Sequence, residues 1–201
     1  MRAETSKKIL RFLILVGVIS IAATSPYFLY NLAKFLLKDK KFKYFEEGDE
    51  EKIKDAFSYL KRNGLIKIER DEHDIVVIAT EKGKRRAEKY KLDDLEITAP
   101  KIWDGLWRVV IFDIPDGQRI RRNAFRRKLK ELGFYSLQKS VWLHPFECDE
   151  EINFLRQFFG LDKNQVEILL VKNIENDIIV KKIKSVYKIL NKCQRKNQRG
   201  L

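Results

Sequence analysis

Seven basic residues gather in one short stretch of this sequence, between positions 119 and 130, with no acid before Glu131. Fixed positive charges bind phosphate groups, whereas a helix face that only contacts solvent usually mixes Glu with Lys. The stretch therefore predicts a phosphate-binding helix, and a solvated helix face is the structural alternative. The predicted nucleic-acid-binding residues of this stretch are Arg119, Arg121, Arg122, Arg126, Arg127, Lys128 and Lys130.

The chain as a whole is also basic. Its 201 residues include 42 Lys and Arg against 29 Asp and Glu, which gives a formal net charge of +13. Such an excess favours a polyanionic partner, either nucleic acid or an anionic membrane surface. Two isolated cysteines and two scattered histidines argue against a disulfide framework or a Cys/His metal site, and they fit a reducing cytoplasm.

Two carboxylates precede the basic stretch and suggest a different chemistry. Asp113 follows the apolar run at 107–112, and Asp116 stands three residues later. Carboxylate oxygens are preferred ligands of Mg²⁺, which can activate water against a phosphodiester. Asp113 is thus the candidate catalytic residue, and Asp113 with Asp116 the candidate metal ligands. In the structural alternative, which needs no cofactor, Asp113 accepts hydrogen bonds from the following turn or pairs with Arg122.

The elements that would position these residues follow one order: strand, helix, strand, strand, helix, strand. Glycines after the two helices, Gly133 and Gly160, mark where each helix ends. This β-α-β-β-α-β order is that of the ferredoxin-like fold, with both helices on one face of a four-stranded antiparallel sheet. The predicted strands are 107–112, 134–138, 140–143 and 166–171, and the predicted helices are 118–132, one from 149, and an amphipathic helix at 177–193.

The first half of the chain predicts a winged helix-turn-helix. Its third helix has an apolar stripe of Ile53, Ala56, Phe57 and Leu60, and a hairpin and a helix at 81–90 follow. Basic residues of the third helix are expected to contact phosphates. Acids at 46–51 would repel DNA, so a dimerisation or protein-docking module is the alternative. The predicted nucleic-acid-binding residues here are Lys52, Lys61 and Arg62.

Residues 12–33 contain no charge and allow two interpretations. A run of 22 residues is long enough to span a bilayer, and Lys7, Lys8 and Arg11 would form its positive flank. However, Thr24-Ser25-Pro26 interrupts the run. We therefore expect a buried first helix up to Ala23 and a second helix after the break, with a membrane span as the alternative.

An ordered set of motifs in the second half resembles a known family. Val110-Ile111-Phe112-Asp113-Ile114-Pro115-Asp116, then Leu132-Gly133-Phe134, then Leu137-Gln138-Lys139-Ser140-Val141-Trp142 resembles the ferredoxin-like nuclease subunit of CRISPR systems, the second CRISPR-associated protein. Trp142-Leu143-His144-Pro145 and the preceding winged helix are more similar to the phenylacetate-operon (PaaX) repressor family. The resemblance is close over residues 103–171 and loose over 6–98.

The resemblance implies an α+β chain with a winged helix-turn-helix at 1–98, a ferredoxin-like domain at 99–172, and a C-terminal amphipathic helix and tail at 173–201. It also implies a homodimeric, cytoplasmic DNA-binding repressor that contacts duplex DNA without catalysis. One alternative is a Mg²⁺-dependent endonuclease or CRISPR adaptation scaffold that uses Asp113. The second alternative is a membrane-tethered or protein-docking module.

Overall fold

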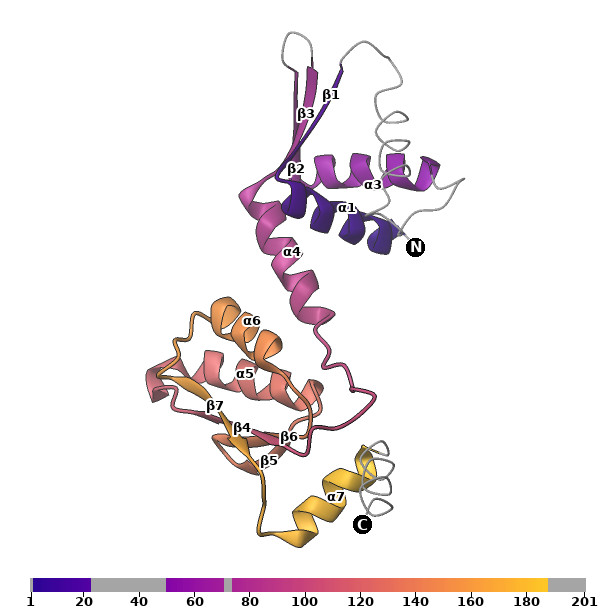
Figure 1. Cartoon of the computed structure of the whole chain (residues 1–201). Coiled ribbons are helices and arrows are strands. Elements are labelled where there is room, and N and C mark those ends of the chain that lie inside the picture. Colours follow the sequence, from indigo (N-terminus) through magenta and orange to yellow (C-terminus); the bar gives the residue numbers. More distant parts are fainter. Residues whose placement is uncertain (1, 23–49, 71–73, 188–201) are drawn as a thin grey trace. The chain divides into compact units, whose positions relative to one another are not determined.

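The computed structural model describes residues 2–22, 50–70 and 74–187, which are coloured in Figure 1. The chain divides into two units, Met1–Asp94 and Leu95–Leu201, called here the N-terminal and C-terminal units. Each unit has its own sheet, with the strand order β1-β3-β2 in the first and β5-β6-β4-β7 in the second. Helices pack on both sheets, so the mixed α and β composition is confirmed.

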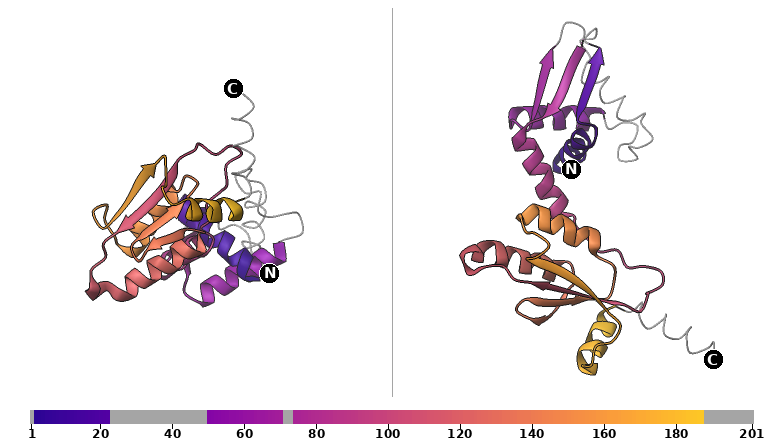
Figure 2. Two further views of the ribbon diagram at one scale, coloured as in Figure 1. Left: turned by 90° about the horizontal axis from the view of Figure 1, so that it is seen from below. Right: turned by 60° about the vertical axis from the view of Figure 1, so that its left-hand side comes forward.

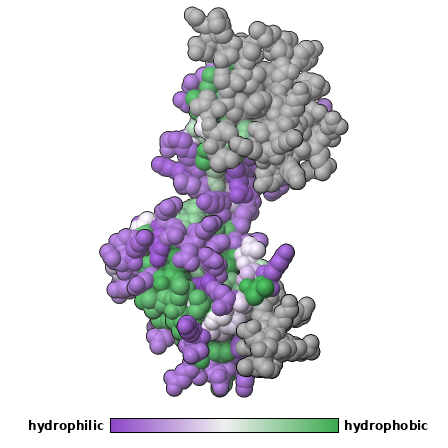
Figure 3. Space-filling model, in the orientation of Figure 1, coloured by the Kyte–Doolittle hydropathy of each residue, from purple (hydrophilic) through white to green (hydrophobic). Residues whose placement is uncertain are grey.

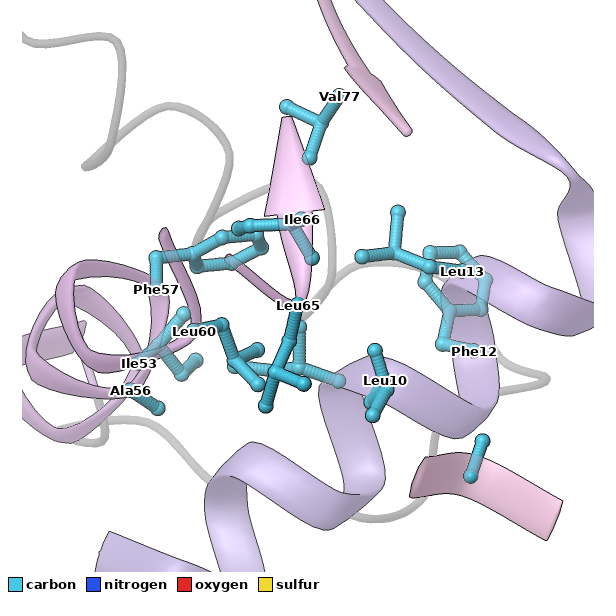
Figure 4. Close-up of a cluster of buried hydrophobic side chains, with 12 residues drawn as sticks. Leu10, Phe12, Leu13, Ile53, Ala56, Phe57, Leu60, Leu65, Ile66 and Val77 are labelled. Carbon is cyan, nitrogen blue, oxygen red and sulfur yellow. The ribbon is translucent and has the colours of Figure 1, made fainter. Parts of the chain in front are cut away.

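The N-terminal unit is built around the apolar stripe of its second described helix. Ile53, Ala56, Phe57 and Leu60 are all fully buried, as their spacing predicts. Figure 4 shows them packed against apolar side chains of the first helix and of the hairpin. The elements are α1 (Arg2–Val16), β1 (Val18–Ala22), α3 (Glu50–Arg62), β2 (Ile66–Arg70), β3 (Asp74–Ala79) and α4 (Glu81–Asp93).

The first apolar helix forms and is buried, but its predicted end at Ala23 is wrong. It ends at Val16, and Gly17 has the positive φ of 77° that often terminates a helix. The β-branched residues that follow favour a strand, and Val18–Ala22 pairs with β3 in antiparallel register. Backbone pairing thus separates 18–22 from the helix. Within the described residues, no helix combines the length and apolar character needed to cross a membrane.

The winged helix-turn-helix remains a prediction. Its expected second helix falls in 23–49, outside the described residues. The hairpin and the helix after it form as expected, and Thr80 caps that helix by accepting a hydrogen bond from the Gly83 amide at 3.1 Å. The Thr80 hydroxyl also donates to the Gly64 carbonyl at 2.7 Å, which joins the helix start to the turn before the hairpin.

The C-terminal unit has the strand order and the antiparallel pairing of a ferredoxin-like sheet. Helices α5 and α6 lie on one face of the sheet and α7 lies on the other, as Figures 1 and 2 show. Phe112 meets Phe125 of α5 edge to face, with ring centroids 5.1 Å apart. The elements are β4 (Trp107–Phe112), a short 3-10 helix η1 (Asp116–Gln118), α5 (Arg119–Glu131), β5 (Tyr135–Gln138), β6 (Val141–His144), α6 (Asp149–Phe159), β7 (Val166–Val171) and α7 (Asp177–Val186).

Helix α7 covers an apolar sheet face that includes Trp107 and Val109. Ile183 is its buried contact, as predicted. The helix is shorter than expected because it ends at Val186, whose side chain is exposed instead of buried. The predicted continuation over 188–193 lies outside the described residues.

The end of α7 is fastened by a hydrogen-bond chain through a buried histidine. The Phe146 amide donates to Nδ1 of His144 at 3.1 Å, which leaves Nε2 to carry the ring proton. Nε2 lies 3.2 Å from the Tyr187 hydroxyl, which donates to the Gly133 carbonyl at 2.8 Å. Burial lowers the pKa of His144 to about 4, so the neutral ring is the folded form at neutral pH.

Substitution of Gly83 by Ala should destabilise the N-terminal unit, although Ala is the better helix former. A Cβ at this position would lie 2.0 Å from the Leu65 carbonyl oxygen, a backbone atom that cannot move aside cheaply. We expect a loss of about 3 kcal/mol or more in urea denaturation. Gly117→Ala is the control, because a Cβ there meets nothing within 4 Å, and it should change stability by less than about 0.5 kcal/mol. A Gly83→Ala protein as stable as the parent would contradict the packing.

The His144 ring should make stability depend on pH in a known direction. Its pKa is lowered in the folded state, so its contribution is complete above the unfolded value of about 6.5 and is lost as the pH falls towards 4. We expect the stability difference between the parent and His144→Gln to shrink by about 2 to 3 kcal/mol between pH 7 and pH 4.5. The measurement is urea denaturation at both pH values. A difference independent of pH would contradict a buried neutral ring.

Candidate nucleic-acid interface

The site lies at the end of the C-terminal sheet where strand β4 stops, and the topology brings three segments together there. Strand β4 ends there, α5 begins there, and the turn between β5 and β6 lies at the same end of the sheet. The Phe112 amide donates to the Ser140 carbonyl at 3.0 Å, and the Asp113 amide donates to the Gln165 carbonyl at 2.9 Å. Side chains from the start of α5 and from the β5–β6 turn therefore meet.

These side chains line an open hollow of about 750 Å³, called here the α5 hollow. It has four cationic side chains and one carboxylate, so its lining carries a strong positive field. Three of the cations stand on α5 at spacings of three and four residues, which places them on one helix face. The lining residues are Asp116, Arg119, Arg122, Asn123, Arg126, Lys139 and Ser140.

Arg126 is oriented by contacts that leave its charge uncompensated. Its Nε donates to the Lys139 carbonyl at 2.8 Å, and its guanidinium lies 5.7 Å from the centre of the Phe112 ring. Neither contact is with an acid. Its two Nη atoms make no hydrogen bond with the described residues, so they can donate to a ligand in the hollow.

Arg122 is held more firmly. Its side chain is 21% exposed, and Nη1 donates to Asp116 Oδ1 at 2.6 Å and to the Ile114 carbonyl at 3.3 Å. The predicted alternative that Arg122 pairs with Asp113 is therefore replaced by pairing with Asp116. The Nε of Arg122 is buried and finds no hydrogen-bond partner among the described residues, so the pairing does not satisfy this side chain fully.

The start of α5 places positive charge where a helix normally avoids it. Arg119, Arg121 and Arg122 stand in the first turn, which has no acid and no side-chain cap. The helix dipole is positive at this end, so each cation there costs about 0.3–1 kcal/mol when exposed. A bound anion would reverse that unfavourable interaction. The three arginines thus destabilise the first turn of α5, and a bound phosphate would offset that effect.

The other basic residues of α5 differ in their placement. Arg121 reaches the Gln118 side chain at 3.0 Å and the Gly160 carbonyl at 3.4 Å, which ties α5 to the end of α6. Arg127 and Lys130 are exposed. Lys128 departs from the prediction, because its side chain is buried and its Nζ lies 3.4 Å from Glu131. It therefore does not belong to the exposed basic surface.

The predicted basic residues of the first half lie on a separate unit. Lys52, Lys61 and Arg62 are exposed on α3, and they do not contribute to the α5 hollow. Their proposed contact with phosphates stays a prediction.

The two candidate metal ligands do not form a metal site in the described residues. Asp113 is exposed at the end of β4, while Asp116 is bonded to the Arg122 guanidinium, a cation that competes with any metal for the same oxygen. Within 2–22, 50–70 and 74–187, no three His, Cys, Asp or Glu side chains come together as metal ligands would. The residues present do not fit Mg²⁺, and a catalytic role for Asp113 remains a prediction.

Lys139, Ser140 and Asn123 line the hollow without having been predicted as site residues. The predicted topology could have identified Lys139 and Ser140. In a β-α-β-β-α-β chain the turn between the second and third strands lies at the end of the sheet where the first helix begins. That rule places positions 139 and 140 beside the first turn of α5.

The comparison with known families identifies the C-terminal unit. Residues 100–177 match the family model described as the PaaX protein central Cas2-like domain. The predicted resemblance is confirmed, and the match extends from the segment before β4 into the first turn of α7. No curated protein matches the chain.

Proposed function

We propose that this protein, which carries a Cas2-like domain of the PaaX type, is a transcriptional regulator that binds duplex DNA through the α5 hollow. The PaaX match supports the regulator class. The protein would act as a homodimer in the cytoplasm, without cleaving its DNA. The α5 hollow is the observation on which the proposal rests.

The chemistry of the hollow favours a phosphate backbone over other anions. Arginine guanidinium groups form charge-assisted hydrogen bonds with phosphate oxygens, and several on one face can follow neighbouring phosphates. Within the part of the chain that the structure describes, the hollow has no aromatic lining residue on which a base could stack. We therefore propose contacts with the sugar-phosphate backbone that do not depend on sequence.

Sequence-specific contacts, if this regulator has them, belong to the predicted winged helix in our proposal. The α3 cations would then contact phosphates of the same duplex. This division follows the general pattern in which backbone contacts position a protein and base contacts specify its site.

The edge strand β7 supports a homodimer. It pairs with β4 on one side only in the described sheet. Leu169 and Leu170 are 40% and 61% exposed and point to opposite sheet faces, and Figure 3 shows hydrophobic side chains at the surface of the C-terminal unit where Figure 1 draws β7. The opposite edge, β5, instead exposes the polar residues Ser136 and Gln138. An apolar edge strand favours association with a second copy.

Neutralising one hollow arginine should weaken DNA binding in a salt-dependent manner. For Arg126→Gln or Arg119→Gln we expect affinity for a mixed-sequence duplex to fall roughly three- to tenfold at low salt. The slope of log K against log salt should lose about one unit. The measurement is fluorescence anisotropy with a labelled duplex over a salt series.

The matched control for this titration is Lys181→Gln, which removes one exposed charge from α7 on the other sheet face. It should change affinity less than about twofold. An absence of binding by the parent protein at low salt would contradict the proposal, as would equal losses in Arg126→Gln and Lys181→Gln.

A charge on the edge strand should separate the proposed dimer. Leu170→Lys places an ammonium group in the β7 surface, which would be desolvated by a partner strand. Light scattering after size-exclusion chromatography should give a dimer mass for the parent and a monomer mass for the variant. Ile178→Lys, an equally apolar and exposed position on α7, should stay dimeric. A monomeric parent, or a dimeric Leu170→Lys protein, would show that β7 is not the interface.

A further inference from the structure

The α5 hollow is lined by four cationic side chains and by one carboxylate, that of Asp116, to which the proposed function assigns no role. We infer that a backbone phosphate enters the hollow in exchange for Asp116, which holds Arg122 until the phosphate replaces it. This inference rests on the proposed function. It assigns Asp116 the role of an internal competitor that occupies the phosphate-binding guanidinium in the DNA-free protein.

The two partners of this ion pair differ strongly in their exposure to solvent. Arg122 is 21% exposed and is also held by the Ile114 carbonyl, whereas Asp116 is 94% exposed. Among the described residues its carboxylate is hydrogen-bonded to Arg122 alone, at 2.6 Å. The guanidinium is therefore fixed by the protein, and the carboxylate can rotate into solvent at little cost because an exposed ion pair contributes little stability.

A phosphate can make contacts that Asp116 does not make. The carboxylate is bonded to Arg122 alone, although Arg119, Arg126 and Lys139 line the same hollow. A phosphodiester offers several oxygens to donors on different side chains, and arginine binds phosphate in a bidentate manner.

In the DNA-free protein Asp116 balances the charge of Arg122. Exchange keeps the charge of Arg122 balanced in both states. The side chain would thereby be prevented from collapsing onto the protein before DNA arrives.

The first test compares two variants that each remove one negative charge. Asp116→Asn should bind a fluorescein-labelled mixed-sequence duplex roughly three- to tenfold more tightly than the parent at low salt, because the competing carboxylate is gone. Glu150→Gln is the control, because Glu150 is exposed at the start of α6 and does not line the hollow. It should change affinity less than about twofold. Unchanged or weaker binding by Asp116→Asn would overturn the inference.

The second test asks whether the effect passes through Arg122. In an Arg122→Gln background the exchange cannot occur, so Asp116→Asn should give no further gain in affinity. An equal gain in both backgrounds would mean that Asp116 acts only through the general field, and this would also overturn the inference. Melting curves establish that each variant is folded. If Arg122→Gln does not fold, the comparison of Asp116→Asn with Glu150→Gln decides.

The outcomes separate this inference from the proposed function. If Arg126→Gln and Arg119→Gln weaken binding but Asp116→Asn does not strengthen it, the hollow binds DNA without exchange. If no arginine variant changes binding, the proposed function fails and the inference fails with it.

Discussion

The candidate site depends on one electrostatic constraint: the first turn of α5 concentrates arginine at the positive end of a helix dipole. The fold has to hold these charges in place with little compensating negative charge. Arg122 pairs with the single exposed carboxylate of Asp116, and Arg126, one turn further along α5, is held by one backbone carbonyl and an aromatic ring. A partner with its own negative charge is the natural complement to such a surface.

A structural arginine in the same unit shows the contrast. Arg108 is buried on β4 and forms two hydrogen bonds with Asp104, at 2.6 and 2.8 Å. This pairing lowers the pKa of the Asp104 carboxyl and raises the pKa of Arg108. The chain thus pairs a cation with an acid where the role is structural. At the α5 hollow it supplies one acid for four cations, which argues that the imbalance there serves binding.

Much of the C-terminal unit could be predicted because its elements have strong local patterns. The bounds of β4 and β7 follow from runs that are apolar except for one charged residue each, and Gly133 and Gly160 mark the helix ends correctly. The segment 18–22 was misassigned because hydrophobicity alone does not distinguish a buried helix from a strand paired with β3. Lys128 was predicted on the exposed basic surface because its burial depends on how α5 packs. Lys139 was not predicted as a site residue because it is far from α5 in local pattern and is brought to the hollow by the β5–β6 turn.

Binding in the α5 hollow can be observed directly in an NMR titration that follows the arginine Nε–H signals as unlabelled duplex DNA is added. We expect the signals of Arg119, Arg122 and Arg126 to shift with a common saturation curve, while that of the buried, acid-paired Arg108 stays in place. Shifts confined to other parts of the protein, with the three hollow arginines unmoved at saturation, would contradict it.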